Sequence, residues 1–257
     1  MSPVWVYRLK GSPWELDPLI PELFARGARG LEEREGEILA YFPAPQDLPY
    51  GGVWEAFPDE DWLEAWRRDL KPVEAGPFLV LAPWHSWEGE GIPLVIEPGM
   101  AFGTGHHETT RLALAALARH LRPGEKVLDL GTGSGILAIA AARLGGEAVG
   151  VDVDGSVLPQ AEANARQNGV SVRFLLGSLE EARPLGPFGL VVANLFAELH
   201  RDLAPLYPEA LAPGGRLLLT GILKEKAPLV REALAGAGLG PLEEAAEGEW
   251  VLLAYRR

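Results

Sequence analysis

Two regular patterns of apolar and polar positions alternate through the second half of the chain. From Lys126 onward, short apolar runs typical of strands alternate with segments whose apolar residues recur every three or four positions, as on one face of a helix. This alternation predicts an α/β fold, with a parallel sheet covered by helices on both faces. The expected strands are 126–131, 147–154, 172–179, 190–195, 214–223 and 249–257, and the expected helices are 136–145, 156–169, 199–211 and 226–238.

The two ends of this region depart from strict alternation. Segment 240–257 has no helix between its apolar parts, which predicts a terminal hairpin and fits an antiparallel last strand. Upstream, 77–84 and 92–99 are strand-like. A loop punctuated by glycines follows, and it leads into a helix that is expected to start at Thr109 and Thr110.

Residues 1–58 follow a different pattern. Strands are expected at 4–9 and 53–57, with a helix at 13–27 and two strands joined by a turn at Glu35-Gly36 between them. This small α+β unit has no glycine-rich loop, so we interpret it as a substrate-recognition domain. A merely stabilising extension is the alternative. Residues 59–72 predict one linker helix with an apolar face, which ends at Pro72, and 73–257 then form the main domain.

The run VLDLGTGSG, residues 127–135, is a strand that breaks into three alternating glycines before a helix. Such a turn lets a ligand approach the backbone at Gly131 and Gly133 and presents free N–H groups to it. A second strand ends in Asp152, 21 positions after Gly131. This is close to the spacing of the acid that binds ribose in nucleotide-binding βαβ units.

Asp129 lies just before the glycine turn, in a D-x-G-x-G-x-G pattern. A carboxylate there would repel a pyrophosphate, whereas it suits the ammonium group of an amino acid. S-adenosylmethionine has a ribose and an ammonium but no phosphate, so it fits these residues. Asn194 ends a buried strand at the carboxyl edge of the sheet, where ligands bind in open α/β folds. A structural asparagine that only closes the strand is the alternative.

Composition narrows the function further. The chain of 257 residues has no cysteine and a net charge of −13, which argues against nucleic-acid binding through the overall field and allows a basic partner. No apolar run is long enough to span a bilayer, and the N-terminus lacks the pattern of a signal peptide, so a cytoplasmic location is expected. The adjacent His106 and His107 have no third ligand at a recognisable spacing, so no metal site is expected.

These motifs also resemble a known family. DLGTGSG, GVDVD, VVANL and LAPGGRLLLTG are similar to those of the Rossmann-like class I S-adenosylmethionine-dependent methyltransferases. The stretch EPGMAFGTGHHETTRLAL resembles the hallmark F-G-T-G-x-H-x-T-T of the bacterial enzymes that methylate the eleventh protein of the large ribosomal subunit. The matching residues are Phe102, Gly103, Thr104, Gly105, His107, Thr109 and Thr110.

The resemblance implies a cofactor, a reaction and site residues. It places cofactor contacts at Thr110, Gly131, Asp152 and Asn194, and the predicted cofactor-binding set is completed by Asp129, Gly133, Phe102 and Gly103. The family adds methyl groups to lysine ε-amines and to the N-terminal α-amine of the ribosomal protein, and it implies a monomer whose small domain grips that substrate.

For catalysis, we expect Asn194 and the backbone carbonyl of Leu195 to orient the amine, with His107 facing the same pocket. Three alternatives remain: an NAD-dependent dehydrogenase, a methyltransferase for another protein or a nucleic-acid amino group, and a binding module on a relict fold. Asp129 and the terminal hairpin disfavour the first. The sequence N-L-F-A from Asn194, in place of the N-P-P-Y of enzymes that act on nucleobases, disfavours a nucleic-acid substrate.

Overall fold

The chain forms two compact units. The structure is a computed structural model that describes residues 4–28, 30–34, 36–57, 70–87, 89–98 and 107–257. One unit contains the described residues up to Lys71, and the other contains Pro72–Glu97 and the described residues from His107 onward. Most of the predicted linker helix, residues 59–69, lies outside the described residues, as do Phe102 and Gly103.

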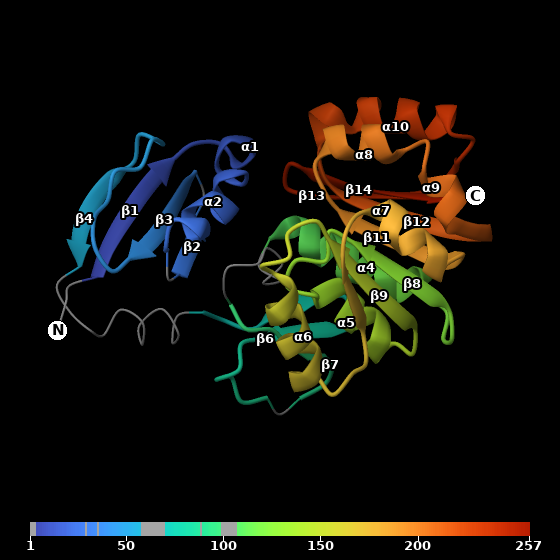
Figure 1. Cartoon of the computed structure of the whole chain (residues 1–257), viewed down its shortest axis with the longest axis horizontal. Helices are drawn as coiled ribbons and strands as arrows, with labels where there is room; N and C mark the ends of the chain where they lie inside the picture. The colour runs from blue at the N-terminus through green and yellow to red at the C-terminus, as the bar shows by residue number, and fades with distance from the viewer. Residues whose placement is uncertain (1–3, 29, 35, 58–69, 88, 99–106) are drawn as a thin grey trace. The chain divides into compact units, whose positions relative to one another are not determined.

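The first unit is an antiparallel sheet with two short helices (Figure 1). Its strand order is β2-β3-β1-β4, and a core that includes Leu23, Ile38 and Phe42 lies between sheet and helices. The predicted helix at 13–27 is two helices, because Pro18 has no N–H for an interior hydrogen bond and stands as the N-cap of the second. The elements are β1 (Val4–Lys10), α1 (Pro13–Leu16), α2 (Leu19–Ala25), β2 (Gly30–Arg34), β3 (Glu37–Phe42) and β4 (Val53–Phe57).

The second unit is built on a seven-stranded sheet with the order β10-β9-β8-β11-β12-β14-β13. The first five strands in this order are parallel, as the alternating pattern predicts. The terminal hairpin is also confirmed, because β14 runs antiparallel to both β12 and β13. The strands are β8 (Lys126–Leu130), β9 (Glu147–Asp152), β10 (Arg173–Leu176), β11 (Phe188–Asn194), β12 (Leu211–Leu223), β13 (Gly240–Glu247) and β14 (Trp250–Arg256).

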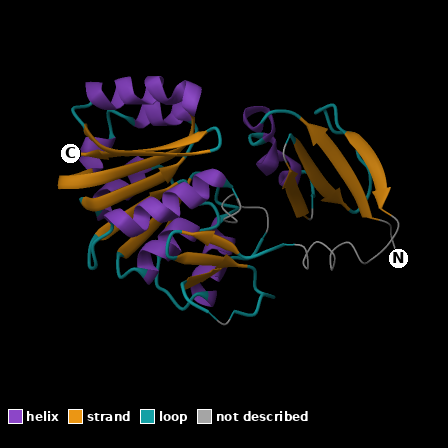
Figure 2. Cartoon of the chain, turned by 180° about the vertical axis from the view of Figure 1, so that it is seen from behind, coloured by secondary structure: helices purple, strands orange, loops and turns teal. Residues whose placement is uncertain are grey.

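Helices cover both faces of this sheet (Figure 2). On one face pack α4 (Glu108–His120), α5 (Ile136–Arg143) and α6 (Leu158–Gln167), and their buried side chains join those of a small sheet of β5 (Val73–Ala75), β6 (Phe78–Leu81) and β7 (Ile92–Val95). On the other face pack α7 (Leu179–Ala182), α8 (Ala197–Leu203), α9 (Tyr207–Ala210) and α10 (Ala227–Gly236). The two apolar cores explain why the central strands are apolar on both sides.

Some predicted boundaries were wrong for local reasons. The helix expected at 199–211 begins earlier, at Ala197, and is split into α8 and α9. The strand expected to run to residue 179 ends at Leu176, because Ser178 and Glu181 form a capping box that starts α7. Strand β5 has only three residues and was not predicted. No helix in the described part of the chain is long and apolar enough to cross a membrane.

Candidate active site

The glycine loop connects β8 to α5 through three left-handed residues. The φ values are 74° at Gly131, 50° at Gly133 and 82° at Gly135. Residues with a side chain rarely adopt such positive φ values, whereas glycine does so readily. The N–H groups of Gly131 and Thr132 both donate to the carbonyl of Val151, at 2.9 Å each. The loop is therefore fixed against the end of β9, at the carboxyl edge of the sheet.

Asp152 ends β9 and is hydrogen-bonded to the same loop. Its Oδ2 accepts the N–H of Gly133 at 2.9 Å, and its Oδ1 accepts the N–H of Asp154 at 3.0 Å. A carboxylate has about four acceptor positions, so the oxygens of this half-buried side chain retain capacity for further donors. The arrangement suits the two hydroxyl groups of a ribose.

Asp129 lies beneath the loop, with only 1% of its surface exposed. Its Oδ2 accepts the hydroxyl of Thr132 at 2.7 Å and the N–H of Ala138, in the first turn of α5, at 3.0 Å. Burial raises the pKa of Asp129 to about 7, the two hydrogen bonds oppose this rise, and the nearby charge of Asp152 adds to it. The side chain thus supports the loop and the start of the helix, and its predicted contact with the cofactor stays a prediction.

Two buried oxygen atoms near the glycine loop and the start of α4 have the chemistry to pair with polar groups of the predicted cofactor. Among the described residues, Oδ1 of Asp129 and Oγ1 of Thr110 are buried without a hydrogen-bond partner. An unsatisfied buried polar group costs about 1–3 kcal/mol, so a polar ligand that pairs with it is favoured. The ammonium, hydroxyl and carboxylate groups of S-adenosylmethionine can supply these partners. The described residues contain no group of three side chains able to hold a metal ion.

Asn194, at the end of β11, is joined to the start of α4. Its Nδ2 donates to the hydroxyl of Thr109 at 3.1 Å. The hydroxyl of Thr109 lies 2.8 Å from Nδ1 of His107, and the N–H of Thr109 donates to the same nitrogen at 3.2 Å. The three side chains form one hydrogen-bonded series, and sequence reasoning singled out only its two ends as catalytic.

His107 is the N-cap of α4, so this helix begins at Glu108 rather than at Thr109. Its side chain is 10% exposed, and its ring lies edge-on to Trp250 with the ring centroids 5.0 Å apart. Because Nδ1 accepts the N–H of Thr109, the neutral ring carries its proton on Nε2. The structure therefore gives His107 a position in the support of Asn194, and its predicted contact with the amine stays a prediction.

The residues after Asn194 are held by a buried group that the sequence did not reveal. The carbonyl of Thr220 accepts the N–H of Leu195 at 3.0 Å and lies 2.8 Å from Nε2 of His200. Nδ1 of His200 lies 3.0 Å from the hydroxyl of Tyr207. Burial lowers the pKa of His200 to about 4, so the ring is neutral at physiological pH.

Gly221 leaves room for the same segment. It has a φ of 80°, and a Cβ atom at this position would lie 2.4 Å from the carbonyl oxygen of Leu195 and 2.9 Å from Oδ1 of Asn194. Only glycine fits this close approach. A glycine directly after the apolar run LLLT is the signal that could have marked this position.

The predicted residues that the structure describes gather at the carboxyl ends of β8, β9 and β11. Gly131, Gly133, Asp129 and Asp152 are joined through the loop, and Asn194 reaches Thr109 in the first turn of α4, next to Thr110. Gly131 brings the two groups together, because a Cβ atom there would lie 2.5 Å from Cδ2 of Leu195. This convergence at one edge is where open α/β sheets bind ligands.

Comparison with known proteins points to one family. The family profile described as ribosomal protein L11 methyltransferase (PrmA) matches residues 44–257. The chain is 77% identical to the ribosomal protein L11 methyltransferase of Thermus thermophilus, over 99% of this chain and 100% of that protein. It is 45% identical to the protein of the same name from Deinococcus radiodurans, over 98% of both chains.

Solved structures agree with this result. The crystal structure of a ribosomal protein L11 methylase from Lactobacillus delbrueckii subsp. bulgaricus has a TM-score of 0.65 and 31% identity, covering 70% of this chain and 93% of that one. A putative methyltransferase complexed with SAH has a TM-score of 0.52, covers 60% of this chain and 50% of that one, and at 12% identity shows a shared fold alone. The described fold is a Rossmann-like class I methyltransferase fold, and the chain belongs to the ribosomal protein L11 methyltransferase family.

Proposed function

We propose that this enzyme transfers methyl groups from S-adenosylmethionine to lysine ε-amines and to the N-terminal α-amine of ribosomal protein L11. The substrate and the cofactor are inferred from membership of the family. The observation that carries the chemistry is the fixed amide of Asn194, whose Nδ2 is held by Thr109 at the edge of the sheet that also bears the glycine loop. An aliphatic amine suits this edge because N-L-F-A offers no proline-framed clamp for a flat base.

The cofactor supplies an electrophilic methyl group on a sulfonium centre. Asp152 is placed to accept hydrogen bonds from ribose hydroxyls, and the left-handed glycines Gly131 and Gly133 allow a close approach to the backbone. Asp129 and Thr110 each have a buried oxygen that a polar group of the ligand can satisfy. We include Phe102 and Gly103 in the cofactor site on the basis of the family motif.

The amine must be neutral and aligned before it attacks. A lysine amine has a reference pKa of about 10.4 and is mostly protonated at neutral pH, so it loses a proton first. Because Nδ2 of Asn194 donates to Thr109, Oδ1 is the atom left to accept an N–H of the amine. Together with the carbonyl of Leu195, it would direct the nitrogen lone pair toward the methyl group, and most of the rate gain comes from this alignment.

In this proposal His107 is a positioning residue. It fixes the hydroxyl of Thr109 through Nδ1, and that hydroxyl fixes the amide of Asn194. Nδ1, the ring nitrogen able to take a proton, already accepts the N–H of Thr109 and contacts its hydroxyl, so water is the simplest acceptor for the proton of the amine.

The first unit, residues up to about 58, is the proposed grip on the protein substrate, with a stabilising extension as the alternative. It has its own core, which includes Leu23 and Phe42. We further propose that residues 59–72 link the two domains and that the enzyme acts as a monomer in the cytoplasm.

Mass spectrometry of purified L11 tests the proposed function. The enzyme is incubated with S-adenosylmethionine and either L11, another ribosomal protein or ribosomal RNA. We expect L11 alone to gain mass in steps of one methyl group. Peptide mapping should locate these groups on lysines and on the N-terminal residue. L11 acetylated at its N-terminus is the matched control, and it should lose only the α-amine products. Methylation of RNA, or of the other protein in place of L11, would overturn the proposal.

A further inference from the structure

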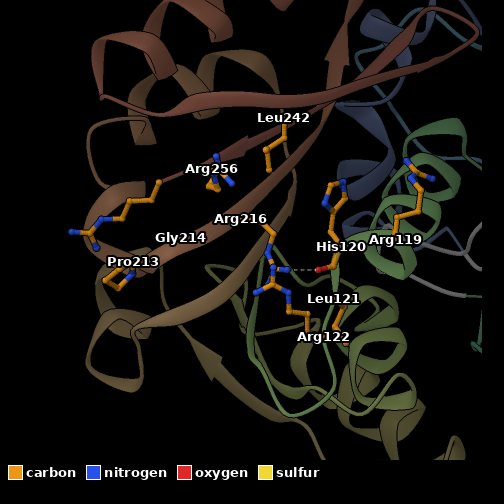
Figure 3. A pocket seen from close by; sticks show the side chains of 10 residues that line it. Arg119, His120, Leu121, Arg122, Pro213, Gly214, Arg216, Leu242 and Arg256 are labelled. Atoms are coloured by element: carbon orange, nitrogen blue, oxygen red, sulfur yellow. Dashed lines mark hydrogen bonds between the residues drawn. The ribbon is translucent and has the colours of Figure 1, made fainter.

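A groove lined by arginines lies at the amino-terminal ends of the parallel strands, whereas the candidate active site lies at their carboxyl ends (Figure 3). Arg216 pairs with Leu190 near the start of β11, whereas Asn194 ends that strand. The groove has a volume of about 790 Å³, and its basic side chains come from the end of α4 and the loop after it, from β12, and from the end of β14 and the residue after it. They are Arg119, His120, Arg122, Arg216, Arg256 and Arg257.

The concentration of positive charge here is unusual for this chain. Five of its 23 lysines and arginines line one groove, although the net charge of the protein is −13. Every one of the five is an arginine, whose planar fork binds phosphate oxygens in pairs. Local charge of this kind attracts an anion even where the overall field does not.

Arg216 forms a fixed base for the groove. Its side chain is only 7% exposed, and it donates to the carbonyl of His120 at 2.7 Å and to the carbonyl of Gly189 at 3.2 Å, and it also pairs with Glu125. Figure 3 shows the guanidinium directed at the His120 carbonyl. The Nε of Arg216 is buried without a hydrogen-bond partner among the described residues. Glu125 and the two carbonyls compensate the buried charge of Arg216 and hold its side chain in place.

Arg256 stands directly opposite Arg216 in the antiparallel pairing of β14 and β12. Side chains of such a pair point to the same face, and like charges there destabilise the sheet. Within the described residues, Arg122 and Arg256 make no ion pair, and Glu243 is engaged with Arg119 at 2.5 Å and with His120 at 2.8 Å. Glu125 and Glu243 together balance two of the five arginines, so the groove keeps a positive excess.

We propose that this groove binds the phosphate backbone of duplex RNA. Several guanidinium groups spread along an open groove match a series of phosphates better than one small anion. The choice of RNA rests on the proposed function, because a protein of the ribosome is met in surroundings rich in RNA. The active site lies at the other edge of the sheet, so RNA held in the groove leaves that site open. The charge of −13 still opposes binding elsewhere on the surface.

Fluorescence anisotropy with a labelled RNA hairpin tests the proposal on the full chain, without cofactor or protein substrate. The variant R122E/R256E is compared with R166E/R173E, which changes the net charge equally at exposed residues of α6 and β10. Arg166 is 71% exposed and Arg173 is exposed. With about three phosphates contacted, affinity for wild type should fall on the order of 40-fold between low and physiological salt. The groove variant should bind RNA at least about tenfold more weakly than wild type. Its slope of log affinity against log salt concentration should be smaller by about two.

Equal binding by the groove variant and the charge-matched control would overturn the proposal. So would selective binding of a poly-glutamate peptide in place of RNA, which would indicate an acidic protein partner. If thermal unfolding shows that charge reversal disturbs the fold, R122Q/R256Q gives the same comparison. The methylation of L11 is measured separately, so loss of the proposed function and loss of the RNA site are distinguishable.

Discussion

The side-chain amide of Asn194 donates to the hydroxyl of Thr109 at 3.1 Å, although the two residues are 85 positions apart in the sequence. This bond joins the end of β11 to the first turn of α4. It also fixes the orientation of the amide, because Nδ2 donates to Thr109 and Oδ1 is left to accept a hydrogen bond from a substrate. Thr109 thereby fixes the orientation of the group that is proposed to receive the amine.

Replacing Thr109 with valine should slow methyl transfer while cofactor affinity stays near that of wild type. Valine keeps the shape but loses the hydroxyl, so the amide of Asn194 becomes free to rotate. A fall in kcat of about tenfold is expected from the loss of alignment. Thr109→Ser retains the hydroxyl and should recover most of the rate. If the valine and serine variants turn over equally, the hydrogen bond does not position Asn194.

Replacing Asn194 with alanine should have a larger effect. The amide oxygen is lost along with its orientation, and single-turnover methyl transfer at saturating cofactor should fall on the order of 100-fold. Since Asn194 is also a proposed cofactor contact, equilibrium binding of S-adenosylmethionine is measured in parallel to separate the two roles. An unchanged single-turnover rate would remove Asn194 from the mechanism.

Most of the main domain was predictable from local patterns. Apolar runs set between helical periods predicted the parallel strands, and the absence of a helix in 240–257 predicted the hairpin of β13 and β14. The glycine spacing and Asp152 predicted one end of the site, because a turn between a strand and a helix depends on nearby residues. These features need no knowledge of distant contacts.

The features that the sequence does not predict depend on contacts between residues that are far apart in the chain. The bond from Asn194 to Thr109 and the support of Leu195 by Thr220 and His200 depend on strand order, which the local pattern does not give. The motif predicts that His107 faces the amine, which stays a prediction, whereas its capping of α4 is seen only in the folded chain. The arginine groove escaped notice because its members are spread from residue 119 to residue 257.

Cofactor affinity should rise with pH because of Asp129. Its pKa is raised to about 7, so a large fraction of the side chain is protonated in slightly acidic solution. If its carboxylate pairs with the ammonium of the cofactor, binding favours the ionised form and should tighten about fivefold from about pH 6 to about pH 7, below the pH at which an α-amino group loses its own proton. Isothermal titration calorimetry measures this change.

Asp129→Asn should bind more weakly and lose the pH dependence of binding. Asp154→Asn is the matched control, since a hydrogen bond from Ser156 holds the pKa of exposed Asp154 below its usual range. That variant should keep the wild-type profile. A pH dependence that survives in Asp129→Asn would show that another group titrates.

His200 should make the protein less stable in acid. Its folded pKa of about 4 lies below the reference of about 6.5, so the unfolded state binds the proton first as pH falls between these values. The contribution lost is about 3 kcal/mol. Asp129 acts in the opposite direction over nearly the same range, because its pKa is raised and its folded state holds the proton.

The Asp129→Asn background separates these two contributions. In that background, the free energy of unfolding from urea titrations should fall from about pH 7 to about pH 4. Adding His200→Gln should lower stability at neutral pH, since hydrogen bonds with Thr220 and Tyr207 are disturbed, and should flatten the pH profile. If the slope persists in the double variant, the acid sensitivity arises elsewhere.

Gly221→Ala should damage the active site beyond its cost in backbone strain. Its φ of 80° makes alanine unfavourable by roughly 1–2 kcal/mol, and the added Cβ would also lie 2.4 Å from the carbonyl oxygen of Leu195. That carbonyl must move, and it is one of the two groups proposed to orient the amine.

Gly238→Ala is the matched control, because its φ is 75° and a Cβ atom there meets nothing within 4 Å. Both variants should therefore lose some stability in thermal unfolding, but only Gly221→Ala should lose methyl transfer strongly in single turnover. Equal activity in the two variants would show that the position of the Leu195 carbonyl does not matter to the reaction.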